Sequence, residues 1–280
     1  YYAPGNDLLD FPGIPENPDN ATVNAAVELL EGIICDFPFD SEASKANALA
    51  GIITPVLRDS INGHVPLQLV DKTKPGTGAS LYADSISLIA TGLPAYMTTQ
   101  PTGREKENEW RKRITAILID DRPVVVVDNL EGIFESPTLC ALLTSTYWSD
   151  RLLGRNESAY LQHRICWMAT GNNIRLGGDL PRRCYKIRLD ARMARPWQRD
   201  TQKFKHPNLL EFVKNSRGRL LAAIYTLART WILAGRPMPK RVPTMGSFEE
   251  WSRTIGGILE FAGVNGFLSN LNKMYDDAET

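Results

Sequence analysis

Five short, mainly apolar segments constrain the fold of this chain more than any other feature of its sequence. They lie at residues 67–71, 94–98, 124–128, 165–170 and 185–189. Apolar segments of this length are typical of strands that are buried on both faces of a sheet. Helical patterns separate most of them, and the clearest, at 105–118, places Trp110, Ile114 and Ile117 on one face. Because buried strands that alternate with helices form parallel sheets, the pattern predicts an α/β fold with a five-stranded parallel core.

The segments on either side of this core have other patterns. Proline and glycine recur in the first twenty residues, which is typical of a linker. Helical periodicity then appears at 22–34 and from Ser41 toward Leu57, and after residue 190 it is the only pattern present. The sequence therefore predicts a linker at 1–21, an α/β core with N-terminal helices at 22–190, and a helical subdomain at 191–280.

Composition narrows the class of protein. With 280 residues, of which 43% are hydrophobic and 23% charged, the chain can bury a large core. No apolar run approaches 18 residues and the polar start does not resemble a signal peptide, so we expect a soluble, cytoplasmic protein without a membrane span. The cysteines (Cys35, Cys140, Cys166, Cys184) and histidines (His64, His163, His206) are scattered. We expect reduced thiols and structural imidazoles rather than a zinc site or disulfides.

The formal net charge of zero conceals an uneven distribution. Residues 1–44 contain nine acidic residues and no lysine or arginine, whereas residues 151–199 carry a net charge of +8. Such a cluster can be an ordinary solvated surface. It can also bind phosphates, either of a nucleotide or of a nucleic acid backbone.

The sequence PGTGAS is separated from the first apolar segment by three residues and precedes a helical pattern that ends near Gly92. Glycines in such a loop let backbone N–H groups face phosphates, and a following hydroxyl ligates Mg²⁺. Isolated glycines mark ordinary turns more often, but the order of strand, glycine loop and helix favours a phosphate site. The expected nucleotide contacts are Pro75, Gly76, Thr77, Gly78, Ala79, Ser80 and Leu81. Ala79 stands where this motif normally has lysine.

Two later strands also end in polar residues. Four valines precede Asp128, which has the form of a Walker B strand whose carboxylate holds Mg²⁺ together with Ser80. A plain core strand that ends in a turn has the same pattern. Residues 165–170 are followed by Gly-Asn-Asn, which includes Asn172 and is otherwise a common turn sequence. Arg182 and Arg183 then precede the last predicted strand.

In this order the four elements, which cover residues 60–190, resemble the AAA+ P-loop ATPases. Within them the chain resembles replicative helicases of phages, plasmids and mobile elements, which are similar to superfamily 3 and MCM-type motors. The resemblance implies that Asn172 orients the attacking water and that Arg182 or Arg183 reaches the nucleotide of a neighbouring subunit in a hexameric ring. It also implies that the helical tail is a lid, in which Arg217 or Arg219 contacts the nucleotide. A solvent-exposed helical arginine is the alternative reading of either residue.

The segment from Arg151 to Arg164 has the pattern of a β-hairpin with its turn at residues 154–156. In motors of the resembled group such a hairpin binds single-stranded DNA in the central pore. Arg155, at the turn, and Arg151 are the expected DNA contacts. An ordinary surface hairpin is the competing interpretation.

The sequence departs from the family pattern at two positions. Ala79 replaces the lysine, and Asn129 stands where a catalytic glutamate usually follows Asp128. Lys74, with Lys72 as a second candidate, can supply the missing positive charge, and Glu131 can polarise water. An engineered substitution at position 79 is a further explanation.

The sequence thus predicts an ATP-dependent DNA helicase or translocase domain of a phage or mobile-element replication protein, with ATP and Mg²⁺ as cofactors. Single-stranded DNA and further copies of the chain are the expected partners. Two alternatives remain. One is a nucleotide-binding scaffold that does not hydrolyse ATP, and the other is a DNA-dependent loader or initiator ATPase.

Overall fold

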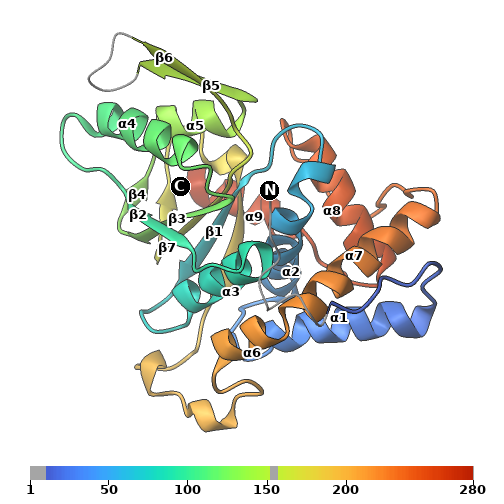
Figure 1. Ribbon diagram of the computed structural model, residues 1–280. Helices are drawn as coiled ribbons and strands as arrows, with labels where there is room; N and C mark the ends of the chain where they lie inside the picture. The colour runs from blue at the N-terminus through green and yellow to red at the C-terminus, as the bar shows by residue number, and fades with distance from the viewer. Residues whose placement is uncertain (1–10, 152–156, 280) are drawn as a thin grey trace.

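The computed structural model describes residues 11–151 and 157–279. Its centre is a five-stranded parallel sheet with the strand order β2-β3-β7-β1-β9 (Figure 1). The strands are β1 (Leu67–Lys72), β2 (Tyr96–Thr99), β3 (Val124–Leu130), β7 (Cys166–Asn172) and β9 (Cys184–Leu189). All five predicted strands are therefore confirmed, as is the α/β fold. The middle strands are nearly or fully buried, whereas β2, at the sheet edge, is partly exposed.

Helices precede, separate and follow the strands. They are α1 (Asn20–Ile34), α2 (Glu42–Val56), α3 (Ala79–Thr91), α4 (Lys106–Ile119), α5 (Pro137–Leu143), α6 (Leu209–Asn215), α7 (Arg217–Leu233), α8 (Glu249–Phe261) and α9 (Leu271–Glu279). The sequence analysis did not predict α5 and α9. Helix α5 spans only seven residues, and α9 buries only Leu271 and Met274, so neither presents a long apolar stripe.

Alternate side chains of β1 point to opposite faces of the sheet, and the two faces have different neighbours. Gln68 faces α2 and α3, where its amide donates to the hydroxyl of Tyr82 at 2.8 Å, and that hydroxyl donates to the carbonyl of Ala48. Leu69 and Asp71 face the opposite side, toward α9. The loop after β1 enters α3, so the sheet centre leads directly to the glycine sequence.

The C-terminal helices pack against the N-terminal ones. Helix α7 packs on α1, α6 on α3 and α8 on α2. Buried apolar side chains from both parts of the chain belong to one core cluster. Because α1 and α2 connect the sheet to the C-terminal helices, the boundary near residue 190 and the separate lid stay predictions.

A hairpin lies outside the central sheet. Strands β5 (Tyr147–Arg151) and β6 (Ser158–Gln162) pair antiparallel and lie beside α4 and α5 (Figure 1). Trp148 donates to the hydroxyl of Thr115 on α4 at 3.0 Å, and Asp150 pairs with Arg111 at 2.6 Å. These contacts attach one face of the hairpin to the core. The expected turn with Arg155 lies outside the described residues.

His163 is buried and hydrogen-bonded within the protein, as expected of a structural histidine. His163 is 4% exposed, and its Nε2 accepts a hydrogen bond of 3.2 Å from the indole of Trp167. Its other nitrogen lies 3.2 Å from the carbonyl oxygen of Ser145, which fixes the neutral tautomer with the hydrogen on Nδ1. Burial lowers the pKa of His163 to about 4. None of the helices in the described part of the chain has the length and hydropathy to cross a membrane.

Candidate phosphate-binding site

The glycine loop connects β1 to α3 and uses left-handed backbone at two positions. Gly76 has φ +77° and Gly78 has φ +100°, conformations that side chains disfavour. Gly78 is the N-cap of α3, and no side chain caps the first amides of this 13-residue helix. A helix N-terminus with amides that lack a side-chain partner is a favourable position for an anion.

The loop departs from the phosphate-loop pattern at a position that the sequence analysis did not note. The full pattern is G-x-x-x-x-G-K-[ST], and with Ser80 as its last residue the first glycine is replaced by Thr73. The Thr73 hydroxyl donates to Asp190 at 3.1 Å, and its amide donates to the carbonyl of Leu189. The side chain of Thr73 thus ties the start of the loop to the end of β9.

Two segments, residues 36–37 and 197–199, pack against the loop. A Cβ atom added to Gly76 would lie 2.9 Å from Cβ of Trp197, and one added to Gly78 would lie 2.9 Å from the ring of Phe37. Arg199 donates to the carbonyl of Thr77 at 3.3 Å and to that of Asp36 at 2.8 Å. These contacts were not predicted, because residues 36–37 and 197–199 are distant from the loop in sequence and approach it only in the tertiary structure.

Three of the predicted site residues come together at the carboxyl ends of adjacent strands. Lys72 and Asn172 are register partners across β1 and β7. Asp128, on β3, accepts a 2.5 Å hydrogen bond from the hydroxyl of Thr170 on β7. The Oδ1 atom of Asn172 is buried and has no hydrogen-bond partner among the described residues. An unpaired buried acceptor is costly, so it marks a place where a ligand or water is expected.

Lys72 ends β1, one strand removed from β3, and its charge interacts with that of Asp128. Its side chain is 8% exposed, and its ammonium makes no hydrogen bond or ion pair with the described residues. Burial lowers the pKa of Lys72, while the charges of Asp128 and Asp71 oppose that shift. Lys74 is exposed in the loop. The two candidate lysines therefore differ in environment: Lys72 is buried at the end of β1, whereas Lys74 is exposed in the loop.

The remaining predicted residues of the loop and of β3 lie around this edge. Ala79 is 2% exposed, so its methyl group is enclosed by the protein, whereas Ser80 is exposed in the first turn of α3. The pairing register of β3 shifts between Val127 and Leu130, and Asn129 has φ +56° in this irregular segment. Asn129 and Glu131 are both exposed.

The two candidate arginine fingers are held by one carboxylate. Arg182 and Arg183 each donate to Asp179 at 2.7 Å through Nη2. Mainly the hydrogen bond from Arg182 lowers the pKa of Asp179 to about 2. Arg183 also donates to Thr144 and its side chain is 12% exposed, whereas that of Arg182 is 62% exposed. Arg182 is therefore the better placed of the two to reach another molecule.

The position of Arg217 corrects the prediction that it contacts the nucleotide. This arginine is 3% exposed and donates to the carbonyls of Leu88, Ile89 and Ala90. Those carbonyls lie in the last turn of α3, while the glycine loop begins the helix, so the two sites are about 15 Å apart along it. Arg217 stabilises the negative end of the helix dipole and does not lie at its positive end.

The donor set fits a nucleotide phosphate chain. It combines the uncapped amides of α3, the ammonium of Lys72 and the unpaired Asn172. For a metal, the described residues contain no group of three or more histidine, cysteine, aspartate or glutamate ligands. Mg²⁺ usually keeps several waters and needs only one or two protein oxygens beside phosphates, so the oxygens of Asp128 and Ser80 are of the type and number that such an ion would need.

The exposed face of the hairpin carries an aromatic pair. The rings of Tyr147 and Tyr160 are stacked with centroids 4.7 Å apart, and the residues are 47% and 71% exposed. Arg151 ends β5 on the same face, because alternate residues of a strand share a face.

No family model and no curated protein matches the chain. Among solved structures, the A-form apo structure of the NrS-1 C-terminal region matches 93% of this chain and 54% of its own, with 10% sequence identity and a TM-score of 0.46. A second A-form apo structure of that region, residues 305–718, matches 78% of this chain and 48% of its own, with 13% identity and a TM-score of 0.42. The chain thus spans about half the length of the structures that it matches.

Proposed function

We propose that this chain is an ATP-hydrolysing motor domain of AAA+ type that acts on single-stranded DNA in the replication of a phage or mobile element. The observation that carries the proposal is the convergence of Lys72, Asp128 and Asn172 at the carboxyl edge of the sheet, beside the uncapped start of α3. Ligands of open α/β sheets bind at this edge, where the strand order reverses. Strand β1 is that point, because β7 and β3 lie on one side of it and β9 on the other.

Phosphate binding is assigned to the backbone of the glycine loop and to Lys72. The amides of residues 76–80 hold the phosphate oxygens, as the left-handed glycines and the free helix end permit. Lys72 supplies the charge that Ala79 cannot. Since the ammonium is buried and unpaired, it needs no rearrangement to stabilise negative charge on the phosphate. A preorganised charge in a water-excluded site stabilises such negative charge far more than the same charge does in water.

Hydrolysis is assigned to the groups around Asn172. The buried amide oxygen of Asn172 positions water, and Thr170 fixes the Asp128 carboxylate, which would hold Mg²⁺ together with Ser80. Bound Mg²⁺ would neutralise the charge of the terminal phosphates. Arg182, exposed beside its partner Asp179, acts on the site of a neighbouring subunit in a ring. Glu131 and Asn129, both exposed at the end of β3, stay secondary candidates for polarising water.

DNA binding is assigned to the exposed face of the hairpin. Stacked tyrosines offer a surface for bases of any sequence, and Arg151 offers charge for the backbone. The hairpin is fixed to α4 by its other face, so this surface is presented rigidly. The predicted contact of Arg155 remains part of the proposal.

A second candidate function is a nucleotide-binding scaffold without hydrolysis. It is favoured by the enclosed Ala79, by the threonine at position 73 and by Asn129 after Asp128. A single pair of measurements separates the two functions. If the protein is an enzyme, wild-type protein should release phosphate from Mg-ATP and single-stranded DNA should raise that rate, whereas Asp128→Ala should lose turnover. Binding of Mg-ATP without turnover, with or without DNA, would favour the scaffold.

A further inference from the structure

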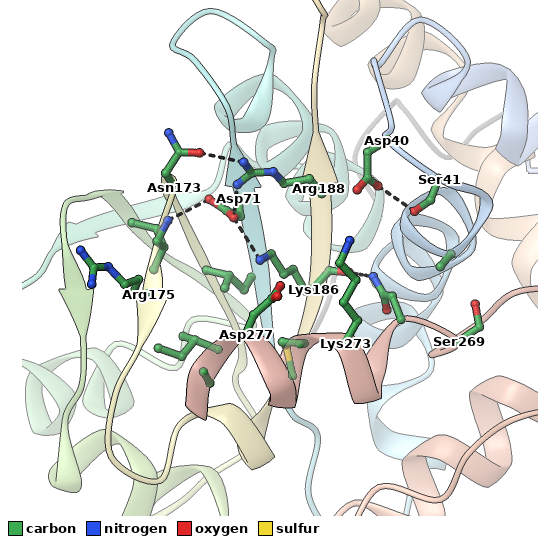
Figure 2. A pocket seen from close by; sticks show the side chains of 17 residues that line it. Asp40, Ser41, Asp71, Asn173, Arg175, Lys186, Arg188, Ser269, Lys273 and Asp277 are labelled. Atoms are coloured by element: carbon green, nitrogen blue, oxygen red, sulfur yellow. Dashed lines mark hydrogen bonds and ion pairs between the residues drawn. The ribbon is translucent and has the colours of Figure 1, made fainter. Parts of the chain in front are cut away.

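A cavity of about 670 Å³ lies on the sheet face opposite α3 (Figure 2). Its lining residues come from β1, β9, α9, the start of α2 and the segment after β7. None of the residues assigned above to phosphate binding or hydrolysis lines it. Its volume is in the range of ordinary small-molecule sites.

The floor of this cavity has an excess of positive charge. Asp71 is 1% exposed, and both Lys186, at 3.3 Å, and Arg188 pair with it. The other oxygen of Asp71 accepts the amide of Ile174 at 3.0 Å. One carboxylate therefore neutralises one of two cations that are themselves only 18% and 24% exposed. A partly buried cation without a full counter-charge is costly unless an anion joins it.

The rim adds charges of both signs. Lys273, on α9, is exposed and lies on the cavity side of its helix, as Figure 2 shows together with Asp277 one turn later. Asp40, across the cavity, already accepts hydrogen bonds from the hydroxyls of Ser41 and Ser44 at 2.7 and 2.6 Å. Arg175 lines the remaining side. Counting all lining residues, four cations face three carboxylates, and one of those carboxylates is already shared by two cations.

The walls contain an apolar surface beside these charges. It is formed by Leu69, Ile174, Leu176 and Met274. The cavity thus has a charged part and an apolar part, and a bare inorganic ion would use only the first.

We propose that this cavity binds a phosphate monoester with an apolar body, of the size of a nucleoside monophosphate. Lys186, Arg188 and Lys273 bind the phosphate, whose oxygens accept several charged donors at once. The apolar walls hold the base or an equivalent ring. The site does not depend on the proposed ATP site, and it needs no metal.

Isothermal titration calorimetry in buffer with EDTA and without Mg²⁺ tests the proposal, with inorganic phosphate, AMP and adenosine as probes. AMP should bind more tightly than phosphate, and adenosine should bind least. The charge-removing variants are Lys273→Gln, on the exposed rim, and Lys186→Gln, which leaves Asp71 balanced by Arg188. Each should weaken AMP binding by about tenfold, the value of one charge-assisted contact.

Two controls separate this site from others. Lys214→Gln removes an exposed lysine from α6, outside the cavity, and should bind AMP as the wild type does. Lys72→Met should also bind AMP normally, because its defect is confined to the glycine-loop site. The proposal is overturned if AMP and phosphate fail to bind the wild type at about 10 mM, a concentration that detects even affinities too weak for a built site. Equal AMP affinity in wild type and both cavity variants, or loss of AMP binding in Lys72→Met, overturns it as well.

Discussion

Lys72, the last residue of β1, and Asp128, near the end of β3, lie at the carboxyl ends of two parallel strands that β7 separates. The two charges interact at a distance, without a hydrogen bond or ion pair between them in the described structure. In the proposed ATP site, Lys72 would contact the phosphate chain and Asp128 would hold Mg²⁺, so the two residues would act on opposite charges of the same ligand.

Removing the charge of Lys72 should therefore abolish most ATP turnover. Lys72→Met keeps the length of the buried side chain, so the fold should persist while phosphate release falls by about 100-fold, the effect of losing one preorganised donor. The exposed Lys74 provides a matched control, and Lys74→Met should retain turnover within about twofold, as is usual for an uninvolved surface group. The reverse pattern would restore Lys74 as the functional lysine.

Gly76 should be sensitive to alanine because of both its backbone and its neighbour. A Cβ atom there meets Cβ and the backbone of Trp197 at 2.9–3.2 Å, in addition to the strain of φ +77°. Gly103 has φ +86° with nothing within 4 Å, so Gly103→Ala measures the strain alone. We expect Gly103→Ala to cost about 1 kcal/mol and Gly76→Ala clearly more, with loss of nucleotide binding. Equal costs in urea unfolding would show that Trp197 does not press on the loop.

Arg217 should contribute to stability and not to nucleotide affinity. Arg217→Ala leaves the last carbonyls of α3 without their buried donor and should lower the free energy of unfolding by about 2–3 kcal/mol. Arg219→Ala, on the same helix but exposed, should change it little. Nucleotide affinity, measured where each variant is fully folded, should equal that of the wild type. A weaker nucleotide affinity in folded Arg217→Ala would show that this arginine does contribute to nucleotide binding.

His163 should make the fold less stable in acid. Its pKa is lowered from 6.5 to about 4 in the folded state, so the unfolded chain binds a proton more readily between these values. The stability is complete above pH 6.5 and declines as the pH falls toward 4, by about 2 kcal/mol at pH 5. His163→Gln should flatten this part of the pH profile in urea unfolding, whereas His206→Gln, at a more exposed histidine whose pKa burial also lowers, should flatten it less. An unchanged slope in His163→Gln would contradict the assignment.

Tyr160 should contribute to the binding of single-stranded DNA. Tyr160→Ala removes the more exposed ring of the stacked pair and should weaken binding by about tenfold, the value of one base–aromatic stack. Tyr225→Ala, at an exposed tyrosine on α7, serves as the control. Fluorescence anisotropy over a salt series is the measurement. If the two variants have the same affinity for single-stranded DNA, the proposal that the hairpin binds DNA is wrong.

Local pattern alone was enough to predict the sheet. The five apolar segments could hardly be anything but buried strands, and Gly76 and Gly78 between a strand and a helix required a tight loop whatever lay around them. Asp128 was predicted from the apolar strand that it follows, and Asn172 from the resemblance to the AAA+ ATPases. Because both end parallel strands, the sheet places them at one edge.

The tertiary structure decided which charges serve that edge. Lys72 and Lys74 are two residues apart in sequence, but the first is the last residue of a strand and the second lies in the loop, so only the first has a direction set by the sheet. Arg217 starts its own helix, yet the packing of α6 and α7 on α3 carries it to the far end of the helix that it was expected to serve. Trp197 reaches Gly76 across more than a hundred residues. Contacts of this kind depend on which helix covers which face, and that choice is made by the summed packing of the whole core and not by any local segment.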